Sequence, residues 1–324
     1  MTKKIKPSIK LSFTGGISLI IALFLFALLL KNTSLASAEV TIALKMCANM
    51  LIPSLFPLMV ASEIMTSSGA IEKLTRKFSG PIAKILGVSR AATVPYFLGL
   101  FGGYASSCKS SVLLYESGKI SKGDCESIIA LSNMPSLAFM TGFIGIGIFN
   151  NSTVGWVLWT IAVLSTLALG LINKFLFKKD TNVYMSHFKK EKTNKGFSRI
   201  VVDAIAHSAY AMLIICACVV FFSVLMSVLK LYMSEFPLSE KTKNIILGTF
   251  EITKGISTCI NIETASARAL ACAFLVGWSG LCVHFQVIAL CEDADISFKK
   301  YFIFKGFQGI ICVLLAWIVF CFKF

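Results

Sequence analysis

The stretch FLVGWSGLCVHFQV, residues 274–287, carries serine, histidine and glutamine inside an otherwise apolar run. In the hydrocarbon of a membrane, an unpaired polar group costs several kcal/mol, so non-helical backbone is found only where protein or water surrounds it. The polar side chains are Ser279, His284 and Gln286, with Gly277 and Gly280 beside them. The stretch therefore predicts a broken helix that faces a cavity instead of lipid.

The composition is that of a protein that crosses a membrane many times. Of 324 residues, 56% are hydrophobic and 15% charged, and the mean hydropathy is +0.80. Several apolar runs are long enough to cross a hydrocarbon core of about 30 Å. They predict an all-α polytopic membrane protein in the lipid bilayer with about eight to nine membrane helices. The candidate spans are 11–30, 40–66, 91–115, 127–149, 154–177, 203–231, 243–260, 264–291 and 301–322.

The positive charge is concentrated in three stretches. Residues 1–10, 70–90 and 174–199 carry 14 of the 15 net positive charges, and the alternate connections are nearly neutral. Basic loops of membrane proteins stay in the cytoplasm. The pattern predicts a cytoplasmic N-terminus and argues against nucleic acid as a partner.

The N-terminal residues permit two interpretations. The basic start, the apolar run 11–30 and SLASAE at 34–39 fit a retained first helix with an outer loop, or a signal peptide with a small-residue cleavage site. The run is longer than most signal-peptide hydrophobic regions, which favours the retained helix.

A second stretch resembles the opening one. FLGLFGGYASSCKSSVLLYESGKIS (97–121) and FLVGWSGLCVHFQVIALCEDADIS (274–297) share an opening Phe-Leu, an aromatic residue followed by a small residue and glycine, and a closing acidic residue before Ile-Ser. Chance similarity of apolar segments is the alternative. The predicted orientations are opposed, which is typical of inverted-repeat transporters built around re-entrant or broken helices. The predicted units are an N-terminal helix and outer loop (1–39), a first repeat (40–177), a basic cytoplasmic linker (178–199) and a second repeat (200–324).

The candidate site joins these elements. Opened N–H groups at a half-helix N-terminus favour an anion, and Lys109 supplies charge or, alternatively, reaches the interface. Glu251 and Lys254 neutralise each other, bind a coupling ion or face the substrate, unless their segment is an outer loop. His284 is either a proton carrier or a packing residue. The predicted substrate-binding residues are Gly102, Gly103, Tyr104, Ser106, Lys109, Asn133, Glu251, Thr253, Lys254, Gly255, Ser279, Gly280, His284 and Gln286.

Motifs of familiar enzymes and metal sites are missing from the sequence. The eleven cysteines form no CxxC pair and lie mostly in apolar spans, so we interpret them as small buried hydrophobes. There is no HExxH, GxSxG or Walker loop. We predict no enzyme, no cofactor and no metal, and transport that is downhill or ion-coupled.

Several motifs resemble one family. LGTFEITKGIS, GLCVHFQV and EDADISFKKYF resemble the C-terminal half of the YlbJ-type sporulation integral membrane proteins. PSLFPLMVASEIM (53–65), FGGYASSCK (101–109) and ESGKISKGDCESIIALSNMPSLAFM (116–140) resemble their N-terminal half, so the resemblance covers most of the chain in order. It implies membership of the nucleoside-recognition or Gate-domain group, with inverted repeats and helical hairpins.

The resemblance also implies a function. It suggests a role in endospore formation, with dipicolinate carried from the mother cell across the outer forespore membrane. The positions transferred are Gly103, Tyr104, Lys109, Asn133, Glu251, Thr253, Gly255, Gly280, His284 and Gln286. The chain departs from the family pattern at Gly102, Ala105 and Ser107, where the family tends to have serine, proline and a later glycine.

Three functions compete. The leading hypothesis is a transporter of a small organic anion, because Lys109, Lys254 and His284 with opened backbone would hold carboxylates and aromatic side chains would stack on a ring. The alternatives are a nucleoside or nucleobase transporter and a non-transporting sporulation scaffold. A homo-oligomer is compatible with each.

Overall fold

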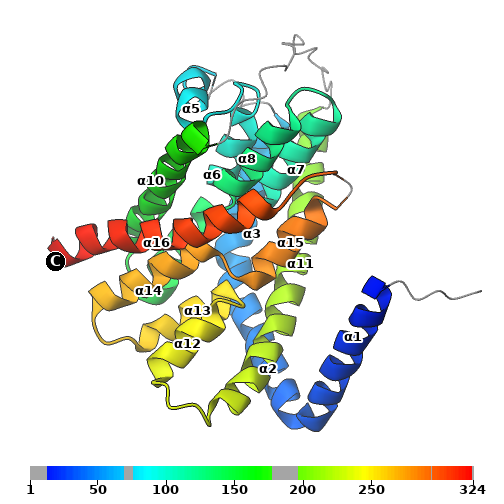
Figure 1. Cartoon of the computed structure of the whole chain (residues 1–324), viewed down its shortest axis with the longest axis vertical. Helices are drawn as coiled ribbons and strands as arrows, with labels where there is room; N and C mark the ends of the chain where they lie inside the picture. The colour runs from blue at the N-terminus through cyan, green and yellow to red at the C-terminus, as the bar shows by residue number, and fades with distance from the viewer. Residues whose placement is uncertain (1–12, 69–75, 177–195, 293, 323–324) are drawn as a thin grey trace, which may run out of the picture.

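A computed structural model describes residues 13–68, 76–176, 196–292 and 294–322. Within these ranges the regular structure is entirely helical (Figure 1). The elements are α1 Phe13–Lys31, α2 Thr33–Met46, η1 Cys47–Leu51, α3 Ile52–Ser67, α5 Ser79–Leu86, α6 Thr93–Gly102, α7 Tyr104–Glu116, α8 Lys122–Ser132, η2 Phe139–Ile146, α9 Gly147–Phe149, α10 Ser152–Leu176, α11 Phe197–Met233, α12 Glu240–Gly248, α13 Ile252–Thr258, η3 Cys259–Asn261, α14 Ala265–Trp278, α15 Leu281–Leu290 and α16 Lys299–Phe322.

The described helices are those of an integral membrane protein. Four segments are long and apolar enough to cross a bilayer, namely Ser152–Phe175, Phe197–Met233, Ala265–Leu290 and Lys299–Phe320. A fifth results if Ser18–Lys31 and Thr33–Leu51, which are bent by 93°, form one span. The predicted count of about eight to nine is not confirmed, because several other expected spans are short or broken helices. Residues 1–12 and most of the predicted linker 178–199 lie outside the described ranges.

Residues 33–39, which belong to the predicted N-terminal unit with its outer loop (1–39), form the first turns of α2. The chain bends at Asn32, whose Nδ2 donates to the Leu28 carbonyl at 2.8 Å. In Figure 1, α1 stands apart from the main body and α2 returns toward it. The segment extends as a helix because it contains alanines and no proline or glycine, and because α2 packs against α11.

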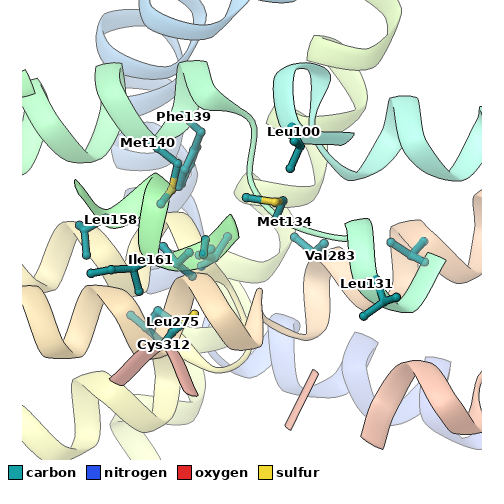
Figure 2. Close-up of a cluster of buried hydrophobic side chains, with 14 of the residues drawn as sticks. Leu100, Leu131, Met134, Phe139, Met140, Leu158, Ile161, Leu275, Val283 and Cys312 are labelled. Carbon is teal, nitrogen blue, oxygen red and sulfur yellow. The ribbon is translucent and has the colours of Figure 1, made fainter. Parts of the chain in front are cut away.

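One hydrophobic core joins the two halves of the chain. Figure 2 shows Leu100, Leu131 and Phe139 from the first half gathered with Leu275 and Val283 from the second. The helices that hold this core together include α10, α14 and α16, which contact one another. The two predicted repeats therefore pack as one unit in the described part of the chain.

Four interruptions divide the central helices. Gly103, at φ 79°, separates α6 from α7, and Ser279 and Gly280, at φ 76° and 83°, separate α14 from α15. These are the two breaks that the matched stretches predict, and they lie 177 residues apart. Two more breaks follow α8, at 133–136, and α12, at 249–251. The second pair includes SNMPS, where Pro135 interrupts the helical run.

Close backbone contact between α14 and α16 gives a first test. A Cβ at Gly277 would lie 2.7 Å from the Gln308 carbonyl oxygen and from the Gly309 Cα. We expect Gly277→Ala to destabilise the protein by about 1–3 kcal/mol, because neither backbone atom can move independently of its helix. Thermal unfolding in detergent, followed by the reaction of buried cysteines with a thiol dye, measures the change.

The matched control is Gly306→Ala in α16. A Cβ there would meet no atom within 4 Å, so this variant should unfold at or slightly above the wild-type temperature. Equal unfolding temperatures for the two variants would show that the close contact does not constrain the packing.

Candidate functional site

The four breaks surround a partly open cavity of about 80 Å³. A water molecule needs about 10–15 Å³ of such space, so several could fit. The lining comes from the first break (Gly102, Gly103, Tyr104, Ala105), from the second (Pro135, Ser136), from the third (Glu251, Ile252, Thr253), from the fourth (Ser279, Cys282, Val283, Gln286), and from the apolar wall (Leu51, Leu55, Met59, Phe139, Ile215, Val219). The cavity therefore lies where elements from both halves of the chain meet.

Gly103 allows two breaks to approach each other. Its φ of 79° is a conformation that glycine adopts without steric cost. A Cβ there would lie 3.2 Å from both the backbone N and the Cβ of Ser136. The break between α6 and α7 thus packs directly on the break after α8.

The N-terminus of α7 is the open one at the cavity. The first N–H groups of a helix have no partner within it, and no side chain caps α7. In the described part of the chain, no hydrogen bond joins the N–H groups of Tyr104, Ala105 or Ser106 to a capping group. Since Tyr104 and Ala105 line the cavity, these donors give its wall a preference for an anion.

The N-terminus of α15, at the fourth break, is already satisfied. Leu281 N–H and Cys282 N–H of α15 donate to the Thr249 and Phe250 carbonyls at 2.9 and 2.8 Å. The indole N–H of Trp278 also donates to the Thr249 carbonyl, at 3.0 Å. The third break is therefore bonded to the fourth, as the first break is packed on the second.

Glu251 caps its own helix. Its carboxylate accepts from the backbone N–H groups of Thr253 and Lys254 at 2.9 and 2.5 Å. The Lys254 ammonium instead pairs with Glu39 of α2 at 2.5 Å and donates to Ser227 Oγ of α11 at 2.6 Å. Of the roles predicted for this pair, mutual neutralisation is therefore not the arrangement that forms.

Tyr104 and Gln286 connect the two matched elements. The Tyr104 hydroxyl donates to Gln286 Oε1, and both residues line the cavity. The two residues are 182 positions apart in sequence, and they come from α7 and α15. This hydrogen bond crosses the site between the two halves of the chain.

A buried polar network lies beside the cavity. His284 Nδ1 is 2.6 Å from the Tyr301 hydroxyl, which also bonds to Asn133 Nδ2. Lys305 has no exposed surface and donates to the Asn133 carbonyl at 2.7 Å and to Gln308 Oε1 at 2.8 Å. The lysine thus holds a carbonyl at the second break. Tyr301 and Lys305 were not predicted from the sequence, although a lysine inside the apolar run 299–322 was a usable signal.

The structure divides the predicted site residues into two groups. Those that line the cavity are Gly102, Gly103, Tyr104, Glu251, Thr253, Ser279 and Gln286. Those outside the lining are Ser106, Lys109, Asn133, Lys254, Gly255, Gly280 and His284.

Residues of the second group have other contacts or positions. Lys109 is exposed, and Ser106 is half-buried. Gly255 lets α13 contact Gly248 of α12. A Cβ at Gly280 would lie 3.1 Å from the Ile252 nitrogen. These two glycines therefore shape the backbone around the cavity.

The geometry defines a helical integral membrane protein with broken helices around a small, partly open cavity. The chain is similar to the sporulation integral membrane protein YlbJ of Bacillus subtilis (strain 168), with 24% identity over 336 aligned positions. The alignment covers 91% of this chain and 81% of that protein, which supports the resemblance to YlbJ-type proteins. No protein-family model matches the chain. No solved structure matches it either.

The ion pair between α2 and α13 gives a second test. The side chains of Glu39 and Lys254 are 17% and 21% exposed, so removing one partner leaves a largely buried charge. We expect Glu39→Ala to cost about 1–3 kcal/mol, less than a fully buried pair because Ser227 still accepts from Lys254. Thermal unfolding in detergent measures this loss of stability relative to the wild-type protein.

The matched control is Asp295→Ala. This change breaks the Lys122–Asp295 pair, which has the more open side-chain exposures of 43% and 96%. It should change stability by about 1 kcal/mol or less. A loss as large as that of Glu39→Ala would contradict the role assigned to burial.

Proposed function

We propose that this protein is a membrane transporter of a small organic anion, with dipicolinate as the leading substrate. The observation that carries the proposal is the partly open cavity at which four helix breaks meet beside the uncapped N-terminus of α7. Transporters with broken helices bind anionic groups at half-helix N-termini, where backbone donors and the helix dipole act together.

The polar lining suits a small aromatic dicarboxylate. The α7 N–H groups would bind one carboxylate, and Ser136 offers a hydroxyl group on the wall. The Tyr104 ring and the apolar wall, which includes Phe139, would contact the flat face of an aromatic ring. Neither Lys109 nor His284 takes part in this version of the site.

The sequence similarity supplies the biological setting. The relative is named as a sporulation integral membrane protein, which supports a role in endospore formation. We propose the outer forespore membrane as the location, and the distribution of basic residues supports a cytoplasmic N-terminus. We also propose the grouping with Gate-domain proteins and their inverted repeats, which accounts for the matched breaks at Gly103 and Gly280. Transport is downhill or ion-coupled.

A nucleoside or nucleobase transporter is the second candidate. Two features of the cavity favour it. Most of the wall is apolar, and the Gln286 amide and the Glu251 carboxyl line the cavity, where they would hydrogen-bond to a neutral base. A competition binding assay separates the two candidates. If the protein is a nucleoside transporter, uridine should displace a bound nucleoside and dicarboxylates should not.

Dipicolinate uptake into proteoliposomes tests the proposal. Gly103→Ala would place a methyl group 3.2 Å from Ser136 at the cavity and strain a positive φ. We expect uptake to fall about tenfold or more, corresponding to roughly 1.4 kcal/mol, because the α7 N-terminus shifts from its position. Initial rates are compared at equal amounts of reconstituted protein.

Gly118→Ala is the matched control, because Gly118 also has a positive φ, of 68°, but no atom lies near its added Cβ. It should keep most of the wild-type flux. Absence of dipicolinate flux in the wild-type protein would refute the substrate, and equal losses in the two variants would refute the site.

A further inference from the structure

Glu251 is the single Asp, Glu, Lys, Arg or His side chain among the residues that line the cavity. It is 1% exposed, and each of its carboxylate oxygens accepts one backbone N–H from the start of α13. Burial of this carboxylate favours its neutral form, whereas the two backbone N–H bonds and a hydrogen bond from the Thr253 side chain favour its charged form. Its remaining surroundings are mostly apolar side chains of the cavity wall.

The nearest cation is committed elsewhere. Lys254, three residues along, directs its ammonium to Glu39, Ser227 Oγ and the Ser223 carbonyl. The Glu251 carboxylate therefore lacks an ammonium or guanidinium within a salt-bridge distance in the described part of the chain. An anion in the cavity would meet this charge without a neutralising partner beside it.

The other titratable groups around Glu251 do not remove the charge. Tyr104 of α7, Cys282 of α15 and Cys47 of η1 face it, and phenols and thiols are ordinarily neutral near pH 7. Cys218 of α11, whose thiol shares a hydrogen bond with Cys282, also faces it, and ionisation of that thiol would add negative charge beside Glu251.

The described basic side chains of the helices packed against α13 have other partners. Lys243 of α12 and Lys230 of α11 pair with Glu240 at 3.3 and 3.2 Å, and the Arg268 guanidinium of α14 donates to the Ile262 carbonyl at 2.8 Å. At the far end of α11, Arg199 and His207 pair with Asp203 and Glu63. None of these side chains forms an ion pair with Glu251.

We propose that Glu251 is the coupling-proton site of the transporter, taking up one proton from water when an organic anion occupies the cavity. This inference rests on the proposed anion transport. Two like charges in a small, largely apolar site repel strongly, and protonation of the carboxylate removes that repulsion. By thermodynamic reciprocity, the proton then raises the affinity for the anion as much as the anion raises the affinity for the proton.

The chemistry of the site favours a proton over a metal cation. A hard cation of the calcium or magnesium type needs about six oxygen ligands, whereas a proton needs one lone pair. Among the described residues, no group of three or more His, Cys, Asp or Glu is placed to hold a metal ion. Glu251 offers a single carboxylate in a wall of otherwise neutral residues.

Calorimetry of dipicolinate binding to the purified full-length protein tests the proposal. Titrations in two buffers with different ionisation enthalpies, repeated between about pH 5.5 and 8.5, give the number of protons taken up per anion. We expect the wild-type value to approach about one proton within this range. Glu251→Gln should bind without proton uptake, and Glu251→Asp should retain it.

Transport provides a readout that folding defects alone would not imitate. An inward-directed proton gradient should drive accumulation of dipicolinate above equilibrium by the wild-type protein, and Glu251→Gln should only equilibrate it. Glu63→Gln, which changes an acid on α3 that is paired with His207 at 3.3 Å, should accumulate dipicolinate like the wild type.

The outcomes separate this inference from the proposed function. Binding by the wild-type protein without proton uptake at any pH in the range would overturn the coupling site and leave anion transport standing. Accumulation that follows a sodium gradient and ignores the proton gradient would do the same. Absence of any dipicolinate binding by the wild-type protein would overturn the substrate and this inference with it.

Discussion

The structure depends on one constraint: backbone that leaves the helix inside a membrane protein must find its hydrogen-bond partners within the protein or in enclosed water. Two of the four breaks solve this for each other, because the carbonyls of Thr249 and Phe250 accept from the first N–H groups of α15. Lys305 performs a similar role for the Asn133 carbonyl. The start of α7 has no capping group among the described residues, and it lies at the cavity.

Small residues make these contacts possible. Gly103 and Gly280 adopt positive φ values and bring two pairs of breaks within van der Waals distance. Gly277 does the same for the contact between α14 and α16. The shared core in Figure 2 then holds both halves together, so the cavity is formed by packing between the halves and not by either half alone.

The helix breaks were easier to predict from the sequence than the side-chain partners. Gly102-Gly103 and Ser279-Gly280 stood out because glycine and serine together inside an apolar run weaken the helix at that point. The ion-pair partners were harder to predict. Lys254 lies three residues from Glu251, yet its ammonium bonds to Glu39, which is 215 residues away in sequence. His284 and Asn133 were chosen as ligands, but both bond to Tyr301, a residue that no local pattern marked.

By itself, the sequence determined a helical membrane protein, the position of its broken segments and the residues from which a site could be built, because hydropathy and glycine placement act locally along the chain. Only the tertiary structure decided which polar groups line the cavity and which hydrogen-bond to other helices away from it. The reason is that the packing of helices far apart in sequence determines hydrogen-bond partners such as Tyr104 and Gln286. The spacing of residues along the chain does not reveal which helices pack together.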